Sequence, residues 1–223
     1  MPFITALKKQ AKRNRVNVFL DGTYSFALEL EECVRLGLKV GNTLTESEIE
    51  TITQTDKKQK LLTNAIGYLS YRPRSEKEIR NHLFQKYCAK KNVAIPNVVS
   101  GDIDDVIERL KKNGALNEQS FAEWWVEQRT QFKPKGIDFI KRELVAKGIA
   151  SEIIEAAVAK QKEEGGKSEL ENAKNAIAKK MTVFNKLPNL KRQQKIAQFL
   201  RYRGYSWETI KEISRTGEPE ELA

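Results

Sequence analysis

The pattern of apolar and polar positions is alternating near the start of the chain and helical from about residue 57 onward. Apolar residues alternate with polar ones over residues 16–20 and again over residues 24–28, and Asp21–Gly22 separates the two runs. An Asp-Gly step between alternating runs is typical of a tight β-hairpin turn, in which both central residues need a positive φ. A Thr-x-x-Glu capping box at residues 45–48 predicts a short helix to about residue 56. The start of the chain is therefore expected to form a small hairpin and one short helix.

From about residue 57 onward the pattern is helical, with apolar residues three or four positions apart. The start and stop signals divide this stretch into nine helices in groups of three. Asp102 is expected to cap the third of these helices. Gly148 and Gly204 are expected to end the fifth and the eighth, because glycine readily adopts the left-handed conformation that follows many helices.

The second helix of each group carries the same pattern, which indicates an internal repeat. Residues 79–86 superpose on residues 140–147 at an offset of 61 (140 − 79). Residues 140–148 superpose on residues 196–204 at an offset of 56 (196 − 140). Each three-helix unit is too small to bury much surface alone, so we expect the units to stack into an elongated body.

We therefore predict an all-α fold of three tandem three-helix repeats in an elongated arrangement, with a small N-terminal β-hairpin extension. The predicted parts are residues 1–56 (hairpin and short helix), 57–114 (repeat 1), 115–163 (repeat 2) and 164–223 (repeat 3 and tail). The long connection at residues 88–101 contains a proline and is expected to be an exposed insertion in repeat 1.

Composition narrows the possible partners. Hydrophobic residues make up 39% of the chain and charged residues 31%, which favours several small amphipathic units over one large core. Lys and Arg number 40 against 30 Asp and Glu, a net charge of +10. Residues 57–113 hold 13 basic and 6 acidic residues, so most of the excess lies there. We expect an acidic partner: nucleic acid, an anionic surface or an acidic protein.

Several classes of protein are excluded by what the sequence lacks. No run approaches the roughly 18 apolar residues of a membrane span. The first residues lack the pattern of a secretory signal. We therefore expect a cytoplasmic protein that makes no membrane contact.

The sequence also lacks the residue patterns typical of catalytic and metal-binding sites. Cys33 and Cys88 are isolated and His82 is the single histidine, so no disulfide framework, metal site or Ser-His pair is expected. Residues 165–168 end like a phosphate-binding loop, but Gln161 stands where that motif needs a glycine. We expect neither enzyme activity nor a cofactor.

Basic residues gather at one place in each group of helices. Such residues near a helix N-terminus can bind phosphate or carboxylate, so we take them as candidate contacts to a partner protein or nucleic acid. They are Arg72, Arg74, Lys77 and Arg80 in the first group, Arg129, Lys133, Lys135 and Arg142 in the second, and Arg201 and Arg203 in the third. The alternative is a solvated, charged helix face.

Aromatic residues offer a second kind of contact. Tyr71 and Tyr202 lie beside arginines and are candidates for stacking on bases, so Tyr71 joins the candidate contacts. Trp124 and Trp207 fall on apolar helix faces and are expected in the core. Trp125 is adjacent to Trp124 and cannot face the same core squarely, so we expect one of the two to line an interface.

Three stretches carry a resemblance to a known family. They are residues 68–79 (YLSYRPRSEKEI), residues 140–149 (IKRELVAKGI) with Arg129 and Gly136 before them, and residues 199–206 (FLRYRGYS). Together they resemble the RecX regulatory proteins over about residues 57–213. Residues 1–56 resemble the hairpin extension that some members of that family carry.

The resemblance implies tandem three-helix repeats and a non-enzymatic modulator of the RecA recombinase. It implies binding in the groove of the RecA–DNA filament, which limits filament growth, strand exchange, ATP hydrolysis and coprotease activity in DNA repair, DNA recombination and the SOS response. Single- or double-stranded DNA would be an auxiliary contact, and we expect a monomer. The residues alone leave a second hypothesis, an independent helical DNA-binding regulator built on a helix-turn-helix-like unit.

Overall fold

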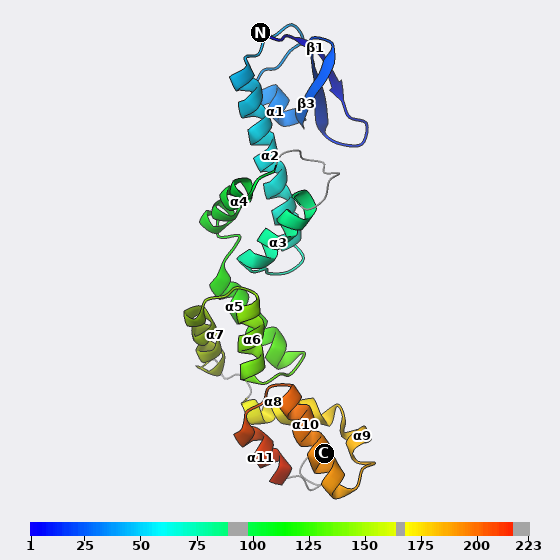
Figure 1. Cartoon of the computed structure of the whole chain (residues 1–223), viewed down its shortest axis with the longest axis vertical. Coiled ribbons are helices and arrows are strands. Elements are labelled where there is room, and N and C mark those ends of the chain that lie inside the picture. The colour runs from blue at the N-terminus through cyan, green and yellow to red at the C-terminus, as the bar shows by residue number, and fades with distance from the viewer. Residues whose placement is uncertain (89–97, 164–167, 216–223) are drawn as a thin grey trace. The chain divides into compact units, whose positions relative to one another are not determined.

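The computed structural model describes residues 1–88, 98–163 and 168–215 (Figure 1). The chain forms two compact units. The first unit comprises Met1–Tyr68 and Asn81–Lys112, and the second comprises Leu69–Arg80 and Asn113–Ala223.

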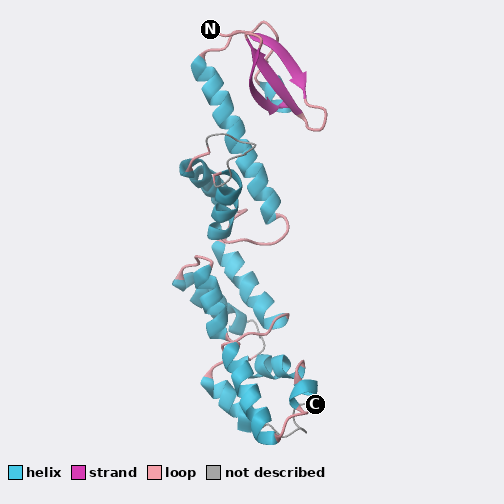
Figure 2. Ribbon diagram, turned by 45° about the vertical axis from the view of Figure 1, so that its right-hand side comes forward, coloured by secondary structure: helices cyan, strands magenta, loops and turns pink. Residues whose placement is uncertain are grey.

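A small antiparallel sheet opens the first unit and is drawn in magenta in Figure 2. Its strands are β1 (Ile4–Lys9), β2 (Arg15–Leu20) and β3 (Thr23–Glu29), in the order β1-β2-β3. The predicted hairpin is β2–β3, and Asp21 and Gly22 turn it with φ values of 48° and 83°. Strand β1 was not predicted, because its residues do not alternate between apolar and polar. It is an edge strand with Ile4 fully buried.

Two helices follow the sheet. Helix α1 (Leu30–Arg35) has no counterpart among the predicted elements. Helix α2 (Glu46–Leu69) starts at the predicted capping box, in which Thr45 and Glu48 exchange hydrogen bonds. The prediction that this helix ends near residue 56 is wrong, since α2 continues without interruption for 24 residues.

Ion pairs explain why the helix continues through a polar stretch. Asp56 accepts from Arg15 of β2 at 2.8 Å and from Lys60 at 2.7 Å, and the Asp56 side chain is buried. Lys57 is also buried and pairs with Asp102 at 2.9 Å. Charges that interrupt the apolar pattern in the sequence are therefore neutralised inside the first unit, where an unpaired charge would be costly.

Helices α3 (Glu76–Tyr87) and α4 (Ser100–Lys112) complete the first group. Asp102 does not cap α4 as predicted, because the helix begins two residues earlier. Its carboxylate instead accepts the Val99 N–H at 2.9 Å and pairs with Lys57. The predicted insertion at residues 88–101 falls mainly on residues 89–97, outside the described residues.

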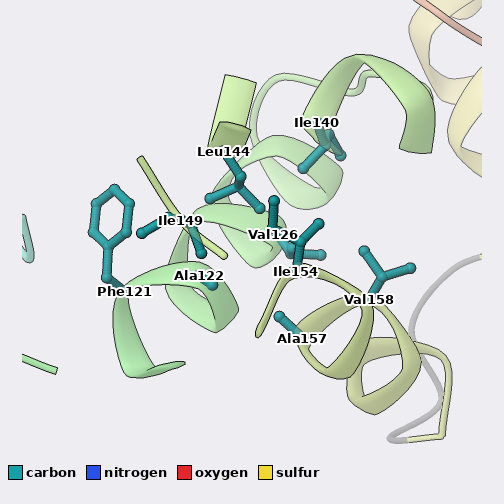
Figure 3. Packing of buried hydrophobic residues seen from close by; sticks show 9 residues of the cluster. All are labelled: Phe121, Ala122, Val126, Ile140, Leu144, Ile149, Ile154, Ala157 and Val158. Atoms are coloured by element: carbon teal, nitrogen blue, oxygen red, sulfur yellow. The ribbon is translucent and has the colours of Figure 1, made fainter. Parts of the chain in front are cut away.

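The second group consists of α5 (Glu118–Gln131), α6 (Ile137–Ala146) and α7 (Ser151–Glu163). The Asn117 side chain caps α5 by accepting the Ser120 N–H. Figure 3 shows one apolar cluster shared by the three helices. Its buried members are Phe121, Ala122, Val126, Ile140, Leu144, Ile149, Ile154, Ala157 and Val158.

The third group has α8 (Glu169–Ala178), α9 (Met181–Phe184), α10 (Asn189–Tyr202) and α11 (Trp207–Arg215). Short helix α9 was not predicted. Trp207 is 67% exposed, so the prediction that it lies in the core is wrong. Tyr205 takes a core position instead, where its hydroxyl donates to the Asn172 carbonyl oxygen at 3.2 Å and burial raises its pKa.

Candidate nucleic-acid interface

A hollow of about 290 Å³ lies against α5 and brings basic and aromatic side chains together. We call it the α5 hollow; it is lined by Arg72, Trp124, Trp125, Gln128, Arg129, Phe132 and Lys133. Residues four positions apart on a helix share a face, so Trp124 and Gln128 form one row and Trp125 and Arg129 form the next, while Phe132 and Lys133 follow the end of α5. The hollow thus brings together three of the predicted contact residues, Arg72, Arg129 and Lys133.

Trp125 lines the hollow, but its ring already contacts cationic side chains and is not a free stacking surface. The Lys147 ammonium and the Arg129 guanidinium lie 4.2 and 4.3 Å from its ring centroid. Its indole Nε1–H donates to Glu143 Oε2 at 2.9 Å, and Arg129 Nε donates to the same oxygen at 2.6 Å. Because cations already cover this ring, Trp125 organises the charges around it.

The start of α3 meets the end of α6 at what we call the first junction. Ser75 Oγ donates to the Lys147 carbonyl oxygen at 2.9 Å, and Lys77 Nζ donates to that of Ala146 at 3.0 Å. These bonds satisfy carbonyl groups that the end of a helix leaves without an intrahelical partner. The side chains of one repeat therefore complete a helix of the next repeat.

Glu78 neutralises cations on both sides of the first junction. It accepts from Arg72 Nη2 at 2.9 Å and from Lys147 Nζ at 2.7 Å. Burial acts to raise the pKa of Glu78, but the hydrogen bonds and charges of Arg72 and Lys147 outweigh it, so the pKa lies below its ordinary value. The carboxylate stays ionised at neutral pH and holds both cations.

An equivalent contact joins the start of α6 to the end of α10, and we call it the second junction. The Gly136 N–H donates to the Arg203 carbonyl oxygen at 2.9 Å. Arg203 Nη1 donates to the Pro134 carbonyl oxygen at 3.0 Å. Lys135 Nζ lies 3.8 Å from the Phe139 ring centroid, and the Arg203 guanidinium lies 4.5 Å from that of Phe199.

The predicted contact residues therefore fall into separate environments. Lys133 and Arg201 are exposed, as are Tyr71 (85%) and Tyr202 (81%). Arg80 pairs with Glu76 at 2.9 Å, and Arg142 Nε donates to the Asp138 carbonyl oxygen at 3.2 Å. The half-buried Arg74 side chain lines a second hollow, of about 380 Å³, beside the start of α5.

Sequence reasoning missed the residues that hold the cations. Glu78 and Glu143 stand in the stretches that carry the family resemblance, but neither was identified as a partner of basic residues. Phe139 and Phe199 were also overlooked as partners of basic groups. The repeat offsets were the available signal, because they align these four positions between the two junctions.

Family models match four stretches of the chain. Their descriptions are "Regulatory protein RecX N-terminal domain" (residues 2–45), "RecX, first three-helix domain" (62–91), "RecX, second three-helix domain" (117–158) and "RecX, third three-helix domain" (167–213). The chain belongs to the RecX family of regulatory proteins. Helix α2 runs across the predicted boundary between residues 56 and 57.

RecX proteins of named bacteria are similar to this chain over most of its length. "Regulatory protein RecX" of Listeria welshimeri is 38% identical over 212 residues, which cover 95% of this chain and 74% of the relative. That of Bacillus velezensis is 33% identical over 211 residues, covering 94% and 75%.

Solved RecX structures share the fold. One, described as "Crystal structure of regulatory protein RecX", has a TM-score of 0.67 at 24% identity and covers 96% of this chain and 100% of its own. RecX from Lactobacillus salivarius has a TM-score of 0.57 at 25% identity and covers 73% and 97%.

Two further observations concern the part of this RecX chain that the structure describes. None of its helices combines the length and the apolar character needed to cross a membrane. Over the same residues, no three His, Cys, Asp or Glu side chains gather in a way that could hold a metal ion.

Replacing Gly136 with alanine is expected to disrupt the second junction. A Cβ atom at this position would overlap the main chain of Gly204 and Tyr205, and main chain cannot move aside as a flexible side chain can. We expect a loss of about 1–3 kcal/mol in the free energy of unfolding of the second unit. Faster hydrogen exchange of the amide at position 136, which in the parent donates to the Arg203 carbonyl oxygen, would report the opening.

The matched control is Gly67→Ala, in the last turn of α2, where a Cβ would meet no atom within 4 Å. That substitution should leave stability unchanged or raise it by about 0.5–1 kcal/mol. Equal effects of the two alanines would show that the close approach at Gly136 is not required.

Proposed function

We propose that this protein binds a RecA-type recombinase filament on DNA and modulates, mainly inhibits, the ATP hydrolysis and strand exchange of the recombinase. It does so without catalytic chemistry of its own, as a cytoplasmic monomer acting in DNA repair, recombination and the SOS response. DNA is an auxiliary contact. Membership of the RecX family carries this proposal, and the basic and aromatic side chains of the second unit support it.

A nucleoprotein filament presents phosphate groups and acidic side chains, so a binder needs accessible positive charge. Lys133 and Arg201 are exposed, and the exposed rings of Tyr71 and Tyr202 can add stacking. Arg72 and Arg129 act differently, because carboxylates hold their guanidinium groups in fixed positions. The remaining candidate contacts are Arg74, Lys77, Arg80, Lys135, Arg142 and Arg203.

The test is ATP turnover by the recombinase on single-stranded DNA with increasing amounts of this protein. We expect turnover to fall, and the double variant Lys133→Glu, Arg201→Glu to need roughly tenfold more protein for the same effect, because like charges then face each other across the contact. Lys12→Glu with Arg13→Glu is the control, since it makes the same charge change at exposed positions between β1 and β2. Unchanged turnover at excess protein would refute the proposal.

The second hypothesis, an independent DNA-binding regulator, predicts a different result. Such a protein would bind naked duplex DNA tightly, with a steep dependence on salt and a preference for particular bases. Weak binding without base preference, together with reduced recombinase turnover, would decide for the filament.

A further inference from the structure

The two junctions are built from equivalent positions but are charged differently. At the offset of 61 (139 − 78), Glu78 corresponds to Phe139, and at the offset of 56 (199 − 143), Glu143 corresponds to Phe199. At the same offsets, Lys147 corresponds to Arg203 and Arg74 to Lys135. These two basic positions are retained at the second junction, whereas Lys77 corresponds to Asp138 and Arg129 to Asn185. Both carboxylates, Glu78 and Glu143, are replaced by phenyl rings.

At the first junction each carboxylate has cationic partners. Glu78 binds Arg72 and Lys147, and Glu143 binds Arg129. These distances, 2.6–2.9 Å, are those of charge-assisted hydrogen bonds, so the donors are already engaged. The positive charges of Arg72, Arg129 and Lys147 at the first junction are therefore balanced by carboxylates of the protein itself.

At the second junction the cations lie over aromatic rings instead. Lys135 and Arg142 lie over Phe139, and Arg203 lies over Phe199. Among the described residues, neither Lys135 nor Arg203 has a carboxylate within ion-pair distance. Burial and the neighbouring Arg203 charge lower the pKa of Lys135, and Glu143, which is engaged by Arg129, opposes the shift.

A ring face orients a cation without cancelling its charge. The quadrupole of the ring attracts the cation by about 0.5–2 kcal/mol but accepts no conventional hydrogen bond. Nitrogen donors of Lys135 and Arg203 are therefore left for an external acceptor. An anion that bridges the two groups would also relieve the repulsion between them.

We propose that Lys135 and Arg203 at the second junction bind a backbone phosphate of single-stranded nucleic acid, with Lys133 as a further cation nearby. This inference rests on the proposed function and identifies the part of the protein that contacts nucleic acid. Exposed rings favour a nucleic acid over an acidic protein surface. Phe132 (63% exposed) precedes Lys133, and Tyr202 (81% exposed) precedes Arg203, so each cation has a neighbouring π-face on which a base can stack.

The test measures binding of the intact protein to a fluorescent 20-nucleotide oligo(dT) by anisotropy at several salt concentrations. Lys135→Gln with Arg203→Gln should bind at least about tenfold more weakly, because two charge-assisted hydrogen bonds are lost. The slope of log affinity against log salt should become shallower by about 0.7, since the two groups hold one phosphate and each phosphate contact to a single strand contributes about 0.7.

The control is Lys191→Gln with Lys195→Gln, which removes the same charge from exposed positions near the other end of α10. Lys191 is twelve residues from Arg203, a distance of about 18 Å along a helix. This variant should keep the slope within about 0.3 of the parent value. Equal losses in the two double variants would mean that only net charge matters, which would overturn the proposal.

A second variant makes the second junction resemble the first. Phe139→Glu supplies the carboxylate that Glu78 supplies in the first junction, so it should engage Lys135 and Arg203 internally and weaken oligo(dT) binding about as much as removing them. Phe139→Leu should retain most of the binding, because both cations keep their charge. Circular dichroism and thermal midpoints establish that each variant is folded before binding is compared.

The remaining outcomes distinguish the phosphate site at the second junction from the proposed binding to a recombinase filament. If the parent protein does not bind oligo(dT), or if its binding is independent of Lys135 and Arg203, the phosphate site is wrong even where recombinase turnover still falls. If the binding of a labelled poly-glutamate peptide depends on these two residues and the binding of oligo(dT) does not, the junction binds an acidic protein surface instead. If oligo(dT) binding depends on them but recombinase turnover never changes, the site stands and the filament proposal fails.

Discussion

Replacing Asp102 with alanine is expected to destabilise the first unit by about 3–5 kcal/mol. The substitution leaves the Lys57 ammonium buried without its carboxylate, since the two side chains are 9% and 7% exposed and lie 2.9 Å apart. It also removes the acceptor of the Val99 N–H at the start of α4. All three tryptophans lie in the second unit, so unfolding of the first unit should be followed by hydrogen exchange in α2 and α4.

The chain offers a matched control one helical turn away. Lys58 and Asp105 pair at 2.6 Å between the same two helices, but their side chains are 47% and 57% exposed. Solvent screens such a pair, so Asp105→Ala should cost less than about 1 kcal/mol. Equal effects of the two alanines would contradict the view that burial makes the Lys57–Asp102 pair indispensable.

A double substitution tests the reason for the loss. Lys57→Met with Asp102→Leu removes both charges together and leaves no buried ion without a partner. It should recover much of the stability lost in Asp102→Ala, because desolvation of a buried pair offsets most of its attraction. A double variant as unstable as Asp102→Ala would show that the loss comes from packing or from the Val99 bond.

Replacing Leu144 with alanine is expected to destabilise the second unit by about 2–5 kcal/mol. Leu144 is fully buried and lies among Ile140, Val126 and Ile149 in Figure 3. Removing most of its side chain leaves a cavity that rigid neighbours fill only in part. Tryptophan fluorescence during urea unfolding measures the change, because Trp124 and Trp125 pack against this cluster.

Val145 is the control for Leu144, because it is the next residue of α6 and is 59% exposed. Val145→Ala should change the free energy of unfolding by less than about 0.5 kcal/mol. A Leu144 variant as stable as the Val145 variant would mean that the apolar face of α6 is assigned incorrectly.

Several predictions that depend on neighbouring residues in the sequence were confirmed. The capping box at residues 45–48 forms its reciprocal hydrogen bonds. Gly148 and Gly204 follow α6 and α10 with φ values of 85° and 74°. Such features are predictable because the interacting groups lie within four residues of one another.

Predictions that needed distant partners were less successful. The extent of α2 was missed because Asp56 finds its counter-ion in Arg15, 41 residues away in the sequence. The role of Asp102 was misread for the same reason, since its partner Lys57 belongs to another helix. Trp207 shows the converse error, because an apolar helix pattern does not ensure that a neighbouring element covers every large side chain.

Sequence alone determined the family, the three-helix repeats, the hairpin and the excess of positive charge, because each is a local or periodic property of the residue order. Tertiary structure decided which of those charges remain available. Glu78 engages a lysine 69 residues away, whereas Phe139 and Phe199 leave their neighbouring cations charged. Neutralisation depends on distances of a few ångströms between side chains, and only folding brings residues so far apart in sequence to such distances.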